Sequence, residues 1–302
     1  MTDGESDYIK AIEYEERGDY PDAAVYLQKS FDKGYQKAVY ALRVNKHVNY
    51  CNESKNRIFT LIEMASSGNT SAEFSVGARY LQGINVAKDL KEGIYWLKKA
   101  SDGGNSDACY YLGKYVEKNP TPGFDSEILI AKAADLGHPL AQNDLARKYL
   151  DGTLPKNPEI ALKLYMDAGN NGYWIATRHA AEMFYNGTGI PRDTRKAFEL
   201  YCKASDAGDP ESCLMVAKMC ESGIGTEKDI DEAVRLYALL AINYTKPGKN
   251  FCNEAAYRLG HIFENGQGVQ TDIEDALYWY SRAADKGHAE SKKAVKRLER
   301  RG

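Results

Sequence analysis

The sequence has no long apolar run. Charged residues interrupt every helical pattern, and no segment approaches the roughly 18 consecutive apolar residues of a membrane-spanning helix. A classical secretory signal is also missing, because the N-terminal stretch MTDGESDYIKAIEYEERGDY is acidic and lacks a basic segment followed by an apolar one. We therefore expect a cytoplasmic protein, unless a specialised secretion route exports it.

The sequence also has no large excess of either positive or negative charge. The formal net charge is −3 over 302 residues, which gives no electrostatic basis for binding nucleic acid or an anionic membrane. The basic stretch of residues 292–301 can be interpreted as a nucleic-acid patch or as the solvated face of a terminal helix. We favour the solvated face, because Ala294, Val295 and Leu298 follow helical spacing on the other side. We expect neither nucleic acid nor membrane as a partner.

Cysteine is sparse, and its positions follow no regular spacing. Cys213 and Cys220 lie seven residues apart on one predicted helix, about 10 Å along its axis, which is too far for a disulfide. We expect all six cysteines to be thiols. They are Cys51, Cys109, Cys202, Cys213, Cys220 and Cys252.

The motifs of common catalytic and metal sites are missing too. No His-x-x-x-His, Cys-x-x-Cys or Gly-x-Ser-x-Gly pattern occurs. Three Gly-x-Gly segments, 187–189, 223–225 and 266–268, follow predicted helices rather than strands, which indicates turns and not phosphate loops. We expect no enzymatic activity, no metal and no cofactor.

Residues 71–105 contain two short amphipathic helices. Ala72, Val76 and Tyr80 share one face of the first helix, which we call helix A and which ends at Gly83. The second, helix B, follows the candidate N-cap Asp89. Its apolar face is formed by Gly93, Trp96, Leu97 and Ala100. Because neither helix is long enough to bury its face alone, the pair needs neighbouring pairs.

The rest of the chain repeats this unit. The glycines that end successive B helices recur every 33 to 36 residues, a period typical of stacked helical repeats. They are Gly68, Gly104, Gly137, Gly172 and Gly208. The next one, Gly287, fits two further units with an insertion at residues 244–252.

The segment AAYRLGHIFENGQGVQTDIEDALYWYSRAADKGH, within residues 253–288, closely resembles the Sel-one-like repeat (SLR), a relative of the tetratricopeptide repeat. Units that begin near Trp174 and Pro210 carry the same signature, and the resemblance covers about four-fifths of the chain. It implies an all-α solenoid of about eight stacked helix pairs in a right-handed superhelix, with a C-terminal capping helix.

We expect residues 1–7 to form a disordered leader, and the resemblance implies that residues 8–302 form a single solenoid. Trp96 and Trp279 hold the same helix B position, so we expect both to be buried between layers. Residues 119–125 should form an inter-helix turn unlike the others. The units lie near 8–35, 36–70, 71–105, 106–139, 140–174, 175–210, 211–252 and 253–288, with the cap at 289–302.

The resemblance also implies a non-enzymatic scaffold or adaptor that binds a protein or peptide partner in a concave groove lined by A helices. One alternative is a regulator or an immunity-type protein that neutralises a toxin or modulates a signalling enzyme. Another is a relative of the cysteine-rich secreted members that hydrolyse β-lactams. The absent signal and the absent ladder of cysteines separate this chain from those members.

Two rows of helix A positions are expected to face the groove. The first row is Phe74, Tyr110, Asn143, Arg178, Leu214 and Tyr257. The second row is Ala78, Lys114, Arg147, Glu182, Lys218 and His261. Aromatic residues are common in the first row of the family, whereas Asn143 and Arg178 depart from that habit.

The cations of these rows suggest a basic centre, which a partner would approach with carboxylates. Arg178→Glu would then weaken binding and leave the melting temperature nearly unchanged. The alternative is that these charges form a solvated face. Trp174, beside Tyr173 at a turn, is interpreted as a contact surface or as packing between repeats.

Overall fold

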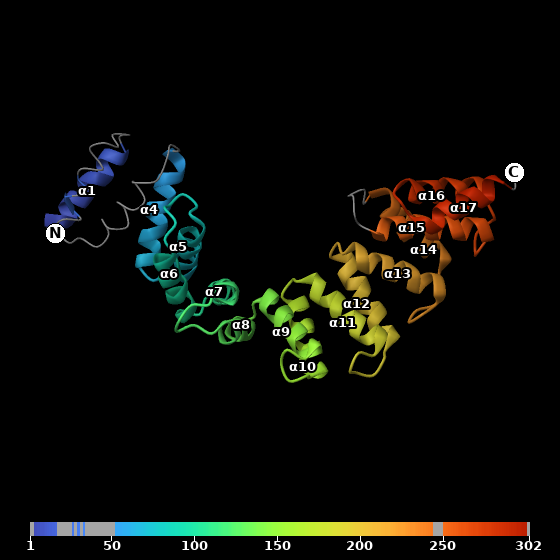
Figure 1. Cartoon of the computed structure of the whole chain (residues 1–302), viewed down its shortest axis with the longest axis horizontal. Coiled ribbons are helices and arrows are strands. Elements are labelled where there is room, and N and C mark those ends of the chain that lie inside the picture. Colours follow the sequence, from blue (N-terminus) through green and yellow to red (C-terminus); the bar gives the residue numbers. More distant parts are fainter. Residues whose placement is uncertain are drawn as a thin grey trace. The chain divides into compact units, whose positions relative to one another are not determined.

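The computed structural model describes residues 3–16, 26, 29–30, 33, 52–243 and 250–300 (Figure 1). These residues form fifteen α-helices and no strand, which confirms the all-α solenoid class. The helices are α1 (Asp3–Glu16), α4 (Asn52–Ser66), α5 (Thr70–Gln82), α6 (Leu90–Asp102), α7 (Ser106–Lys118), α8 (Ser126–Asp135), α9 (Pro139–Asp151), α10 (Pro158–Asn170), α11 (Trp174–Asn186), α12 (Thr194–Asp206), α13 (Pro210–Ser222), α14 (Ile230–Asn243), α15 (Asn250–Asn265), α16 (Ile273–Asp285) and α17 (Ala289–Glu299).

The chain divides into two compact units, residues 1–141 and residues 142–302, and each is described by itself. A and B helices alternate, and consecutive helices pack on each other: α5 on α6 and α6 on α7 in the first unit, α11 on α12 and α12 on α13 in the second. In such an array each layer contacts mainly its neighbours, so no central core is required. The single solenoid over residues 8–302 stays a prediction.

The N-terminal residues differ from the expected disordered leader, because residues 3–7 belong to α1. The Ser30 hydroxyl donates a hydrogen bond to the Gly4 carbonyl at 2.6 Å, and Lys33 forms an ion pair with Asp7 at 2.7 Å. These contacts hold the start of α1 in place. The inter-helix loop of the second predicted unit, and most of the predicted insertion, lie outside the described residues.

Local capping explains where the helices begin and end. Asp89 accepts hydrogen bonds from the backbone N–H groups of Lys91 and Glu92, as its predicted N-cap role requires. Helix α5 ends at Gly83, which has φ +74° and donates its N–H to the Arg79 carbonyl. A residue with a Cβ would be strained in this left-handed conformation.

Burial supports the predicted register of the layers. Trp96 is 2% exposed and lies in a cluster with Val76 and Tyr80, as predicted, whereas Trp279 is half-buried. The capping helix α17 buries Leu298 in a cluster with Tyr280 of α16. No helix among the described residues is long and apolar enough to cross a membrane.

The pair α7–α8 departs from its neighbours. Helix α8 has ten residues, whereas the corresponding α6 and α10 each have thirteen. The loop over residues 119–125 replaces the glycine-rich turn of the other units, as the sequence predicted.

Candidate functional site

Three residues of the first predicted row, Tyr110, Arg178 and Tyr257, contact the residue that caps the next helix A. In the first unit, Tyr110 stacks on His138 with ring centroids 4.4 Å apart. In the second unit, Tyr257 packs against His288 at 4.9 Å. Both histidines cap the next helix A: His138 Nδ1 accepts from the N–H of Ala141, and His288 Nδ1 accepts from that of Ser291. We call such a contact, between a first-row residue and the next N-cap, a rung.

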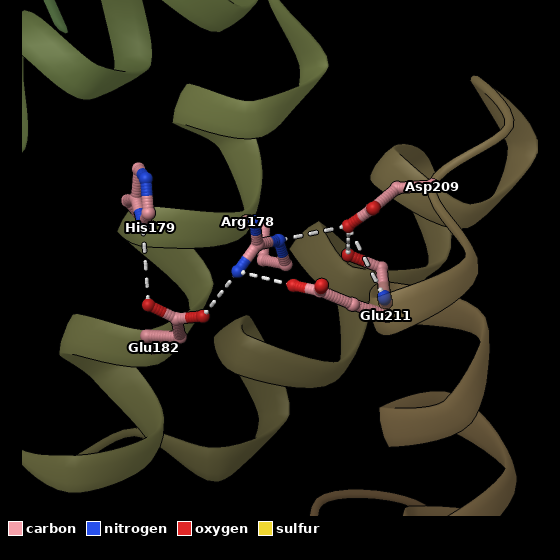
Figure 2. Close-up of polar contacts among 6 residues, drawn as sticks. Arg178, His179, Glu182, Asp209 and Glu211 are labelled. Atoms are coloured by element: carbon pink, nitrogen blue, oxygen red, sulfur yellow. Dashed lines mark hydrogen bonds and ion pairs between the residues drawn. The ribbon is translucent and has the colours of Figure 1, made fainter. Parts of the chain in front are cut away.

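Arg178 forms the same rung with different chemistry (Figure 2). Its Nε lies 2.9 Å from Oδ2 of Asp209, the N-cap of α13. The approach is ionic and not an aligned hydrogen bond, because the Nε–H finds no acceptor in suitable geometry. Asp209 also accepts hydrogen bonds from the N–H and the hydroxyl of Ser212. The aromatic–histidine pair of other layers is thus replaced by an arginine–aspartate pair.

Two further carboxylates complete the Arg178 network (Figure 2). Arg178 Nη1 lies 3.0 Å from Glu182 Oε1 and 2.9 Å from Glu211 Oε2, and Glu182 Oε2 lies 3.2 Å from His179 Nδ1. Burial alone would lower the pKa of Arg178, but the negative charges of Asp209, Glu182 and Glu211 outweigh burial and raise it. Burial would raise the pKa of Glu182, but His179 and Arg178 outweigh it and lower this pKa. Three carboxylates therefore surround one guanidinium, a local excess of negative charge.

The other cations of the predicted basic centre are also paired. Lys218 lies 3.1 Å from Glu254, and Arg147 lies 3.9 Å from Asp144. Lys114, which belongs to the first unit, forms an ion pair with Glu117. Each of these cations therefore has a counter-charge from the chain itself, and the basic centre stays a prediction.

The remaining predicted residues have varied surroundings. Phe74 contacts Tyr111 edge to face at 5.9 Å, and Leu214 packs against the core of the second unit. His261 lies beside Tyr257. The buried Asn143 amide oxygen has no hydrogen-bond partner in the described part of the chain. Trp174 lines a cavity, described below.

The sequence analysis missed a second set of contacts, which are hydrogen bonds between the A and B helices of one pair. The Tyr237 hydroxyl donates to Glu221 at 2.7 Å, and the Tyr280 hydroxyl donates to Glu264 at 3.0 Å. Burial, followed by the neighbouring carboxylate, raises the pKa of both tyrosines. A glutamate and a tyrosine sixteen residues apart are the sequence signal for this contact.

A family model for the Sel1 repeat matches residues 70–105, 106–123, 139–173, 175–209, 210–242 and 253–288, which together make up more than half of the chain. The chain belongs to the Sel1-repeat family. The predicted resemblance to Sel-one-like repeats is thereby confirmed.

Individual relatives of this Sel1-repeat chain are distant. It is 26% identical over 297 residues to the chitin synthase regulator SKT5 of Saccharomyces cerevisiae, and the match covers 93% of this chain and 41% of SKT5. The chain therefore spans about two-fifths of that relative.

Solved structures agree on the fold. The protective antigen c5321 of uropathogenic Escherichia coli, an SLR fold, superposes with a TM-score of 0.71 at 25% identity, covering 91% of this chain and 59% of c5321. A Sel1 repeat protein from Oxalobacter formigenes superposes with a TM-score of 0.62 at 22% identity, covering 96% of this chain and 89% of that protein.

Four cysteines of this Sel1-repeat chain are poorly suited to nucleophilic chemistry. The five in the described residues are free thiols, and Cys51 lies outside them. Burial raises the pKa of Cys202 to about 11 and also raises those of Cys213, Cys220 and Cys252. A thiol with a raised pKa carries little of the reactive thiolate at neutral pH.

Proposed function

We propose that this chain is a non-enzymatic scaffold that binds a protein partner through the A helices of its second unit, around the Arg178 network. Membership of the Sel1-repeat family supports a scaffold. The observation that carries the choice of surface is the local charge. Glu182 and Glu211 remain 40% and 46% exposed although each already contacts Arg178.

This charge favours a partner that presents lysine or arginine at this surface. A partner carboxylate, which the sequence led us to expect here, would meet three carboxylates of the chain itself. Like charges brought together at an interface oppose binding. For the Arg178 surface we therefore replace the acidic partner group by a basic one.

We also propose that binding regulates the partner. SKT5 is named as a regulator of an enzyme, and it matches nearly the whole of this chain. A scaffold that only holds its partner would leave the partner's activity unchanged. Free thiols are consistent with work in the cytoplasm, where cysteines stay reduced, and they weigh against the disulfide-rich hydrolytic alternative.

Affinity capture tests the proposal. The immobilised full chain is incubated with native lysate, and bound proteins are identified by mass spectrometry and compared between wild type and Glu211→Arg. We expect a partner that the wild type retains and the variant loses. Glu199→Arg, an exposed reversal on helix B of the same pair, is the matched control.

Recombinant partner is then assayed with and without the chain. A changed activity supports regulation. A partner retained equally by wild type and Glu211→Arg would remove the binding site from the Arg178 surface.

A further inference from the structure

A cavity of about 160 Å³ lies in the second unit, where the C-terminal ends of α10 and α12 meet the N-terminal end of α11. We call it the Trp174 pocket. It is separate from the Arg178 network, which lies further along α11 and at the start of α13. Its lining includes Met166, Gly169, Trp174, Thr177, Leu200 and Lys203.

Gly169 distinguishes this layer from the others. At the same helix B position the neighbouring units have serine or alanine, such as Ser101 and Ser205. Between α6 and α7, Ser101 Oγ lies 3.0 Å from Cys109 Sγ, so a serine–cysteine contact fills that layer. Here Gly169 faces Thr177, and a Cβ added to the glycine would lie only 2.3 Å from the Thr177 hydroxyl oxygen. A glycine–threonine pair has replaced a serine–cysteine pair.

Lys203 also departs from its equivalents. Lys132 donates to the Ser101 carbonyl at 2.6 Å, and Arg282 donates to the Ala241 carbonyl at 3.2 Å, each tying one B helix to the preceding one. The same pattern would direct Lys203 to the Gly169 carbonyl. Instead, the exposed Lys203 ammonium makes no hydrogen bond or ion pair with any described residue. An unpaired cation therefore stands at the rim of the pocket.

The aromatic pair at the start of α11 has no capping role. Tyr173 occupies the N-cap position without a side-chain hydrogen bond, whereas Asn105 and Asp209 cap the corresponding helices. Trp174 follows it and is half-buried in the pocket lining. Tyr173 packs instead against the core of the second unit, whereas Trp174 is left to line the pocket.

We propose that the Trp174 pocket binds one acidic side chain of the protein partner, with its carboxylate at the Lys203 ammonium and its methylene groups against Trp174 and Leu200. This inference rests on the proposed function only in assuming a protein partner. The unpaired lysine selects a carboxylate, and the pocket volume suits a single side chain. Tryptophan is enriched among the residues that dominate binding energy.

Peptide retention tests the proposal. Two sets of short peptides, identical except for glutamate or glutamine at the centre of an apolar sequence, are passed over the immobilised full chain at moderate salt. We expect the glutamate set to be retained about fivefold more strongly, the range of an exposed ion pair. Equal retention of the two sets would overturn the proposal.

Three variants locate the site. Lys203→Gln should abolish the preference for glutamate, while Lys163→Gln, an exposed lysine on α10 outside the lining, should preserve it. Gly169→Ser combined with Thr177→Cys recreates the Ser101–Cys109 pair, fills the pocket and should lower retention of both sets. Thermal melting establishes that each variant is folded. A glutamate preference that survives in Lys203→Gln would also overturn the proposal.

The peptide test and the capture experiment can give opposite results, so failure of the pocket can be distinguished from failure of the proposed function. A captured partner together with equal peptide retention removes the Trp174 pocket and leaves the scaffold function in place. Selective retention of the glutamate peptides, together with a partner that wild type and Glu211→Arg retain equally, supports the pocket and removes the proposed Arg178 surface.

Discussion

The rung at Arg178 and the rung at Tyr257 occupy equivalent positions in the second unit and use different chemistry. Tyr257 packs against a histidine that caps α17, whereas Arg178 forms an ion pair with an aspartate that caps α13. In both cases the first-row residue contacts the cap of the next helix A. The position therefore keeps its role while both residues of the pair change together. A first-row residue that departs from the family habit, such as Arg178, need not by that alone mark a binding site.

The two rungs also differ in what surrounds them. Arg178 is 18% exposed and Asp209 is 3% exposed, and both belong to a network with two more carboxylates. The Tyr257 rung is mainly an aromatic contact, with Glu254 3.9 Å from the histidine. Removing one partner should therefore lower the free energy of unfolding strongly at the ionic rung and only slightly at the aromatic rung.

The largest effect should come from the packed core, which gives the scale for both rungs. Trp96→Ala should lower the free energy of unfolding by about 3–5 kcal/mol, because it removes a buried aromatic side chain from between helices. Chemical denaturation measures the loss. Leu90→Ala, an exposed apolar residue on the same helix, should change stability little. Similar effects of the two substitutions would contradict the layer packing described here.

Breaking the ionic rung comes next. Arg178→Leu should lower the free energy of unfolding by about 3 kcal/mol, because the buried Asp209 loses its counter-charge. The sequence alone led us to expect an unchanged melting temperature for Arg178→Glu, and the observed network predicts a clear decrease instead. Arg147→Leu, whose side chain is 63% exposed, is the control and should have almost no effect.

Acid should selectively weaken the contact between Glu182 and Arg178. The pKa of Glu182 is lowered from an ordinary value of 4.5. Its stabilising contribution is therefore fully present above about pH 4.5 and is lost as the pH falls through the lowered folded-state pKa. We expect Glu182→Gln to melt below wild type at pH 7, with the gap closing well below pH 4. A gap independent of pH would argue against an ionised Glu182 in the Arg178 network.

The smallest effect concerns exchange of the two chemistries. Tyr257→Arg combined with His288→Asp places an arginine–aspartate pair at the aromatic rung. We expect each single substitution to destabilise by about 1 kcal/mol and the double variant to recover part of the loss, a coupling measured by a double-mutant cycle. Strictly additive losses would show that the rung positions do not act as pairs.

Much of the local structure could be predicted because it depends on neighbours in the sequence. The period of terminal glycines, the cap at Asp89 and the apolar face around Trp96 act over one or two helical turns, and the structure follows them. The start of the chain is the complementary case. Residues 3–7 were expected to be disordered, but they belong to α1, which Ser30 and Lys33 contact from 26 residues away.

The sequence by itself determined the repeat, the helix boundaries and the layer order, since glycine, N-caps and apolar spacing act on the backbone locally. Only the tertiary structure decided which charges are already paired. Arg178 meets Asp209 across a layer boundary, whereas the Lys203 ammonium has no hydrogen bond or ion pair with any described residue, although its equivalents bond the preceding helix. Whether a side chain reaches a partner depends on the spacing of the layers and on the direction of each side chain, which the periodicity of residue types does not encode.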